Sequence, residues 1–272
     1  MSLRTARRLI SGSIVLSLLA GFGAVAQEPR IAVIIDDIGH RLDAGRRSIS
    51  LPGPVTLAIL PYTPFARRLA EEARAGGKDV LVHLPMQASS LLADPGPGTL
   101  TLGQDRSAIG TTLARALAAV PHAIGVSNHM GSLLTRDPLA MHDFMESLAN
   151  QPGLIFIDSY TTHLSVGLMT AREFGIPALK RDVFLDADLS AAGIEAAWQS
   201  LLEQARTHGF AIGIAHPNSA MLEILERNIS TLQDVAVVAL EDLLDGESTQ
   251  RSYAELIGRA PTGDFLTAHR AH

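Results

Sequence analysis

Short apolar runs alternate with amphipathic stretches along most of the chain, and this alternation is the strongest constraint on its fold. The runs, rich in Val, Ile and Leu, cover residues 31–35, 55–60, 79–84, 123–127, 154–157, 178–180, 210–215 and 235–240. Strands that alternate with helices at this spacing are typically parallel and joined by right-handed crossovers. We therefore predict an α/β domain, built either as a (β/α) barrel or as an open doubly wound sheet.

Residues that cap or break helices mark several of the predicted helix ends. Asp137 followed by Pro138 predicts one helix start, Ser190 and Gly209 predict the two ends of a long helix, and Pro217 predicts a further start. No glycine-rich phosphate loop follows the first strand, and there is no Walker A sequence. The barrel is therefore the preferred architecture.

The N-terminal residues have the composition of a secretory signal peptide. Arg4, Arg7 and Arg8 precede the apolar run 9–25, and Ala24-Val25-Ala26, just before Gln27, is a small-x-small cleavage site. We predict cleavage of residues 1–26 and an exported, periplasmic protein that keeps no membrane span. The barrel domain is expected over residues 27–246, and a polar C-terminal tail over residues 247–272.

Charge and cysteine content exclude several classes of function. The formal net charge is −6, and no basic tract occurs outside the signal peptide, which argues against a nucleic-acid partner. The chain has no cysteine. Disulfides, thiol catalysis and cysteine-ligated metals are therefore excluded.

Acidic and histidine side chains gather where the predicted strands end. Asp36 and Asp37 follow the first strand, His83 ends the third, His129 follows the fourth and His216 follows the seventh. Parallel strands bring these ends to one rim. Imidazole and carboxylate ligands suit a divalent ion, with zinc expected first, and three protein ligands leave a position for water. The pattern predicts a metal hydrolase, although Asp36 and Asp37 alone could also form a solvated turn that caps the next helix.

Further candidates for the site lie beside the same strand ends. Substrate contacts are expected from Tyr62, Gln87, Asn128 and Asp158. Other histidines occur in helical or loop contexts and are interpreted as surface or structural residues: His40, His122, His142, His163 and His208.

Taken in order, these motifs resemble the divergent polysaccharide deacetylases, a family of exported bacterial proteins related to the NodB-type enzymes. The matching segments are Asp36-Asp37-Ile-Gly, Leu60-Pro-Tyr62, His83-Leu-Pro-Met86, Asn128-His-Met-Gly-Ser132, Asp158-Ser159 and Ala215-His-Pro217. The resemblance implies an irregular (β/α)7-type barrel of the deacetylase kind. It also implies metal-dependent removal of N- or O-acetyl groups from a cell-envelope or other carbohydrate.

The resemblance also implies roles for individual residues. Asp36 matches the general base, Asp37 and His83 match metal ligands, and His216 matches the general acid. The deacetylase motif has a second metal histidine four residues after the first, where this chain has Gln87. Because an amide oxygen is a poor zinc ligand, we expect His129 on the next strand to supply the missing imidazole.

Two later family motifs, an Arg-x-Pro-Tyr segment and an Asp with a Trp, are not found, and Asp158 and Asp186 are possible substitutes for the acidic residue. These departures leave alternatives open. A catalytically silent barrel could bind glycan or a protein partner of the cell envelope. A two-lobed solute-binding protein is a third interpretation, but no composition break marks a hinge. The enzyme is favoured because the titratable residues at the strand ends are retained.

Overall fold

The computed structural model describes residues 28–244. The predicted signal peptide and the predicted polar tail lie outside the described residues. The strands are β1 (Arg30–Ile38), β2 (Thr56–Ile59), β3 (Val80–Met86), β4 (Gly125–Met130), β5 (Ile155–Asp158), β6 (Ala178–Lys180), β7 (Val183–Phe184), β8 (Phe210–Ala215) and β9 (Ala236–Val237). The helices are α1 (Leu42–Ile49), α2 (Ala66–Ala75), α3 (Arg106–Ala119), α4 (Pro138–Ala149), α5 (Gly167–Glu173), α6 (Ala191–His208), α7 (Ser219–Thr231) and α8 (Leu240–Leu244), with a 3-10 turn at Leu134–Arg136.

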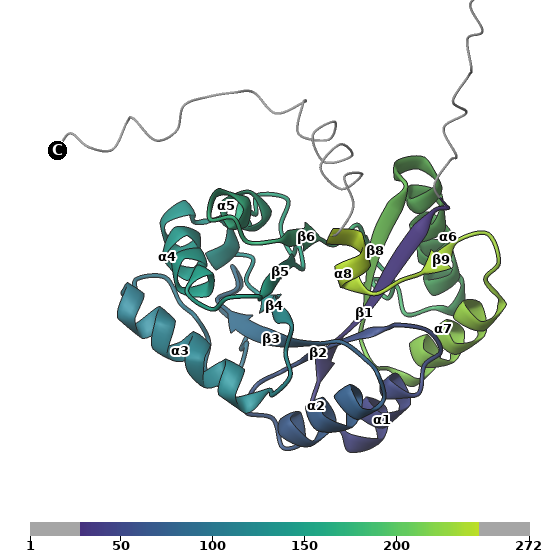
Figure 1. Ribbon diagram of the computed structural model, residues 1–272, viewed down its shortest axis with the longest axis horizontal. Coiled ribbons are helices and arrows are strands. Elements are labelled where there is room, and N and C mark those ends of the chain that lie inside the picture. The colour runs from purple at the N-terminus through teal and green to yellow at the C-terminus, as the bar shows by residue number, and fades with distance from the viewer. Residues whose placement is uncertain (1–27, 245–272) are drawn as a thin grey trace, which may run out of the picture.

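The strands form one curled parallel sheet with helices around its outside (Figure 1). The order is β6-β5-β4-β3-β2-β1-β8-β7, and β9 pairs with the start of β1. This arrangement confirms the predicted α/β barrel, and one continuous sheet replaces the two lobes that a solute-binding protein would need.

The two ends of the sheet order, β6 and β7, belong to a single segment of chain. The Arg181 amide donates to Asp158 O (2.9 Å), on the β5 side, and the next amide, Asp182 N, donates to Ile212 O in β8 (2.9 Å). The chain thus leaves the edge of β5 and joins the edge of β8 within two residues. One split strand therefore bridges the two edges, which gives seven strand positions around an irregular barrel.

The strands are buried on both faces, as expected where helices cover a parallel sheet. In β1, residues 31–35 are at most 1% exposed, and all of β3 is buried. At the amino ends of the strands, Leu240 and Leu243 of α8 are buried, and the Arg30 side chain donates to Asp242 O (2.9 Å). Burial on this scale supplies the stability of a domain without disulfides.

Most predicted helix ends are confirmed. The Asp137 side chain accepts from Leu139 N and Ala140 N at the start of α4, and Ser190 accepts from Gly193 N at the start of α6. Gly209 ends α6 in the left-handed conformation. The start predicted at Pro217 is displaced, because Asn218 is the N-cap of α7 and accepts from Met221 N.

The prediction from the sequence missed or misplaced some short elements. β7 has two residues, too few for a recognisable apolar run. The run predicted over 235–240 divides into β9 and the first residue of α8. None of the helices within residues 28–244 is long and apolar enough to span a bilayer.

Close packing of β4 against β5 at Gly125 gives a stability prediction. A Cβ at this position would lie 2.5 Å from Ile155 O, so Gly125→Ala should lower the free energy of unfolding by about 1–3 kcal/mol through overpacking. Gly110→Ala in α3 is the matched control, because its Cβ would meet Ser147 Oγ at an ordinary 3.7 Å. Alanine favours the helix there, so this control should be neutral or stabilising by about 0.5–1 kcal/mol. Urea denaturation measures both, and equal effects would contradict the packing argument.

Candidate active site

Two adjacent carboxylates reach the same histidine because β1 carries a bulge. Between the pairs Ile35–Leu57 and Ile38–Ile59, β1 advances by three residues while β2 advances by two. Within this bulge Asp37 has a φ of 57°, in the left-handed region. In regular strands neighbouring side chains point to opposite faces, and the bulge removes that alternation. As a result Asp36 Oδ2 and Asp37 Oδ1 both lie 3.4 Å from His83 Nε2.

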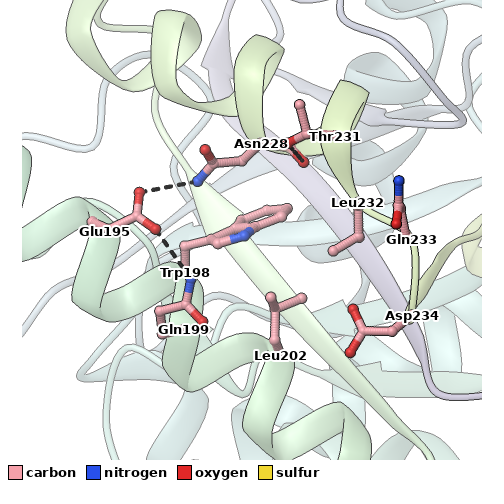
Figure 2. A pocket seen from close by; sticks show the side chains of 9 residues that line it. All are labelled: Glu195, Trp198, Gln199, Leu202, Asn228, Thr231, Leu232, Gln233 and Asp234. Carbon is pink, nitrogen blue, oxygen red and sulfur yellow. Dashed lines mark hydrogen bonds between the residues drawn. The ribbon is translucent and has the colours of Figure 1, made fainter.

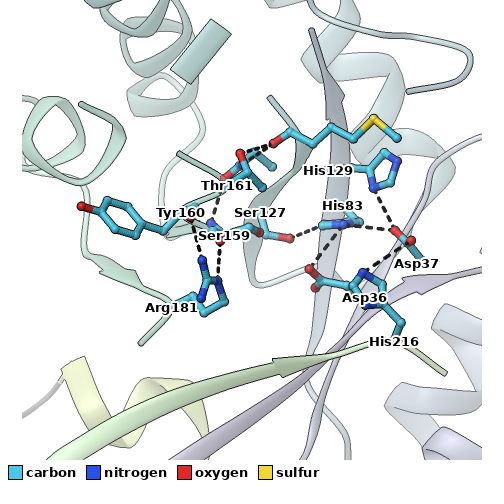
Figure 3. A network of polar contacts seen from close by, with 12 residues as sticks. Asp36, Asp37, His83, Ser127, His129, Ser159, Tyr160, Thr161, Arg181 and His216 are labelled. Atoms are coloured by element: carbon cyan, nitrogen blue, oxygen red, sulfur yellow. Dashed lines mark hydrogen bonds and ion pairs between the residues drawn. The ribbon is translucent and has the colours of Figure 1, made fainter. Parts of the chain in front are cut away.

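The predicted metal ligands converge on one point (Figure 3). Asp37 Oδ1 lies 2.8 Å from His129 Nδ1 and 3.4 Å from His83 Nε2. The two imidazoles come from neighbouring strands and meet edge to face with their centroids 5.0 Å apart. Asp37, His83 and His129 are one of the residue groups, within the described part of the chain, whose ligand atoms could hold a metal ion together.

The chemistry of this group fits a divalent cation. Asp37 Oδ1 is enclosed, yet it has no well-aligned hydrogen-bond partner although two imidazole nitrogens approach it. Two neutral imidazole nitrogens and a carboxylate oxygen would share a zinc-like ion, and they leave further positions for water and substrate. His83 is 2% exposed, so its ring is fixed by its surroundings.

The environments of the two aspartates differ. Burial raises the pKa of Asp36 above its usual range, while the nearby His83 and His216 oppose this effect. For Asp37 burial also raises the pKa, but the approach of His129 and His83 outweighs it and holds the pKa of this carboxyl well below its ordinary value. Asp37 is therefore the group that stays ionised, as a metal ligand must.

His216, which follows β8, faces the ligand group from the other side. Its Nδ1 lies 3.2 Å from both carboxylate oxygens of Asp186, and its backbone N–H donates to Asp186 Oδ2 (2.7 Å). The carboxylate of Asp186 raises the pKa of His216 to about 9. The Phe184 ring stacks on the imidazole. These contacts leave Nε2 directed at the site, 3.7 Å from Asp37 Oδ2.

Asp186 was considered in the sequence only as a substitute for a motif carboxylate, and the structure pairs it with His216. Arg181 was missed as part of the site wall, where it lies over the ring of Phe184. Both belong to the split strand, and Arg181 donates to the carbonyls of Ser159 (2.8 Å) and Tyr160 (2.7 Å). Its one sequence signal is its position between β6 and Asp186, which the prediction treated as a loop.

Behind the predicted metal ligands, polar side chains fix the strand ends. Ser127 Oγ lies 2.8 Å from His83 Nδ1, and metal binding through Nε2 places the proton on Nδ1, which then donates to this hydroxyl. The Asn128 amide donates to Met130 O (2.7 Å) and accepts from Ser159 N (2.9 Å). Asn128 thus joins β4, next to His129, to the end of β5.

The four residues predicted to contact substrate occupy different environments. Tyr62 is 42% exposed at the rim. Asn128 and Asp158 are buried, and Asp158 accepts from Tyr160 N (2.8 Å) and Ser165 Oγ (2.7 Å). The Gln87 side chain accepts from Leu102 N (2.8 Å), so it holds the loop that follows β3. Direct substrate contact by these four residues stays a prediction, and for the two buried ones the structure shows backbone support.

The support of His83 by Ser127 generates a test of the metal centre. Ser127→Ala removes the oxygen 2.8 Å from His83 Nδ1 and should weaken zinc binding about 10–100-fold, as loss of an outer partner of a metal histidine does. Isothermal titration with Zn²⁺ measures the change, with Ser165→Ala, which removes a hydrogen bond to Asp158, as the control at a partly buried serine. Unchanged affinity in Ser127→Ala would show that His83 is not a ligand held in this way.

Comparisons with known proteins agree with this architecture. The chain matches the family described as divergent polysaccharide deacetylase over residues 33–244. An uncharacterized protein of Haemophilus influenzae is 34% identical over 81% of this chain and 78% of its own length. The uncharacterized protein YibQ of Escherichia coli is 32% identical over 79% of this chain and 67% of its own. A crystal structure of an uncharacterized Agrobacterium tumefaciens protein has a TM-score of 0.76 at 24% identity, covering 81% of this chain and 91% of that one, and shows the same fold. The chain belongs to the divergent polysaccharide deacetylase family.

Proposed function

We propose that this protein is an exported, metal-dependent hydrolase that removes acetyl groups from an N- or O-acetylated carbohydrate. The observation that carries the proposal is the convergence of Asp37, His83 and His129 beside a buried carboxylate, Asp36, and a carboxylate-bound imidazole, His216. The family supports the carbohydrate substrate. The signal-peptide pattern of residues 1–26 supports export, and zinc is the ion that best suits a site of two imidazoles and one carboxylate.

Asp37, His83 and His129 would hold the ion. When bound, such an ion lowers the pKa of water and polarises the acetyl carbonyl. Asp36 is next to this site, buried, and one of its oxygens has no hydrogen-bond partner among the described residues. That free oxygen can accept the proton of the attacking water. The water oxygen then forms a bond to the acetyl carbon.

His216 completes the reaction on the leaving-group side. Asp186 binds Nδ1 and fixes the ring, so Nε2 is the nitrogen that can give a proton. As the bond from carbon to nitrogen or oxygen breaks, Nε2 protonates the leaving nitrogen or the leaving alkoxide oxygen, and acetic acid departs and ionises to acetate. Proton exchange with solvent then returns Asp36 and His216 to their starting states.

Although Gln87 stands where the deacetylase motif has a metal-binding histidine, the proposed site still has three ligands. His129, from the strand next to His83, supplies the second imidazole, and Gln87 is engaged by the loop after β3. The catalytically silent alternative rested on this substitution. It predicts no bound metal, so metal content separates the two interpretations.

His129→Ala should abolish stoichiometric metal binding, because it removes one of three ligands. Metal analysis of the purified mature protein should find about one equivalent of zinc or a similar ion in the wild type and little in the variant. His122→Ala is the control: this histidine is exposed just before β4 and belongs to neither group of described residues that could hold a metal ion. Metal in neither protein, even after soaking with Zn²⁺, would contradict the proposal.

Asp186→Asn should lower kcat for deacetylation of chitin or peptidoglycan fragments about 10²–10⁴-fold, because the carboxylate no longer orients and charges His216. Metal content should stay at the wild-type level, since Asp186 is not a ligand. His216→Gln should lose a similar factor. An active Asp186→Asn enzyme with an unchanged pH profile would remove His216 from the acid role.

A further inference from the structure

A hollow of about 360 Å³ opens between α6 and α7, in the outer helical layer (Figure 2). Its walls come from the middle of α6 (residues 195–202), from the last turns of α7 and from the segment 232–234 that follows. That segment leads into β9, which pairs with Arg30 and Ile31 at the start of β1. The hollow therefore lies on the flank of the barrel towards the amino ends of the strands, away from the rim that carries the candidate active site.

Trp198, the single tryptophan of the chain, lines this hollow. The side chain is 2% exposed, yet its indole N–H makes no hydrogen bond to any residue within 28–244, and the nitrogen is not among the atoms sealed from solvent. Buried tryptophans usually find a partner for this group. The indole nitrogen is a donor only, so the hollow presents one unpaired donor, open to the hollow, to a ligand that must accept.

Side chains with both donors and acceptors surround the indole. Glu195 accepts from Gln199 Nε2 (3.1 Å) on its own helix and from Asn228 Nδ2 (3.2 Å) across the hollow. Gln233 stands exposed at the edge. These groups are spaced around a common opening, as Figure 2 shows. Mixed amide and carboxylate groups suit a ligand that carries several hydroxyls.

The charges around the hollow are compensated. Arg227 lies 3.5 Å from Glu195, and Arg206 lies 2.7 Å from Asp234. Because neither carboxylate is left alone, the hollow has no strong preference for a cation or an anion. Leu202 and Leu232 add apolar wall, which suits the C–H face of a ring. A neutral, hydroxyl-rich ring with an apolar face is a pyranose sugar.

We propose that this hollow is a second carbohydrate site, which holds one sugar unit of a polymer at a distance from the active site. The ligand class follows from the groups of the hollow itself. The link to a polymer being deacetylated rests on the proposed function. A site on the flank would hold a long chain against the protein while another of its units reaches the rim.

The single tryptophan makes the test direct, because all indole fluorescence of the protein arises in the hollow. Titration of the metal-loaded mature protein with the N-acetylglucosamine tetramer, and separately with its fully deacetylated form, should change the Trp198 emission in a saturable way. Gln199→Ala keeps the fluorophore and should weaken this response at least tenfold. Gln151→Ala, an exposed glutamine outside the hollow, should leave it unchanged.

Calorimetry and an active-site variant separate the two sites. In the Asp37→Ala background, which removes hydrolysis, Trp198→Phe should weaken calorimetric sugar binding at the hollow at least tenfold, since an aromatic ring remains but the N–H donor is gone. Asp37→Ala should lose metal and hydrolysis but keep the fluorescence response, so failure of the proposed function would not be mistaken for failure of the second site. No emission change with either tetramer, or a change that disappears in Asp37→Ala, would overturn the proposal. A response to a sugar-free peptide alone would do the same.

Discussion

The bulge in β1 is the feature on which the candidate site depends. A regular strand would send Asp36 and Asp37 to opposite faces, and one of the two carboxylates would point into the helical layer. The extra residue and the left-handed backbone at Asp37 turn both towards His83. A non-glycine residue in this conformation costs about 1–3 kcal/mol, which the buried strand around it must offset. Residues 31–35 of β1 are almost fully buried, and this burial stabilises the strand against the cost of the strained backbone at Asp37.

The same kind of strain occurs at other strand ends on the site rim. Tyr62 after β2, Met130 at the end of β4 and Tyr160 after β5 also have positive φ. Met130 O accepts from the side chains of Asn128 and Thr161, and Tyr160 N donates to the Asp158 side chain, so side chains hold the backbone at Met130 and Tyr160. This explains why Asn128 and Asp158 are buried: they keep the rim in the shape that presents His129 and the loops around it.

The sequence predicted the strand–helix alternation, most helix caps and the residues that meet at the rim. Apolar periodicity and caps are local signals, and the alternation itself implies parallel strands whose ends share one rim. Tertiary geometry could not be read in this way. The split strand joins β5 to β8 through Arg181 and Asp182, and two residues of β7 carry no recognisable pattern. The partnership of Asp186 with His216 depends on that segment. A long-range contact made by a short, irregular strand leaves almost no local signal.

The pairing of β3 with β4 explains how His129 can take the place of a histidine at position 87. His129 pairs with Pro85 across β3 and β4, so its side chain stands beside the strand end from which Gln87 continues. An imidazole on the adjacent strand can therefore approach the same point as one placed four residues after His83. Gln87 is instead bound to the neighbouring loops. Its side-chain amide accepts from Leu102 N, its backbone N–H donates to Leu100 O, and its carbonyl accepts from Leu133 N and Leu134 N. In the proposed metal site, this departure from the NodB-type motif moves one ligand to the neighbouring strand, and Gln87 fixes the loop that borders the site.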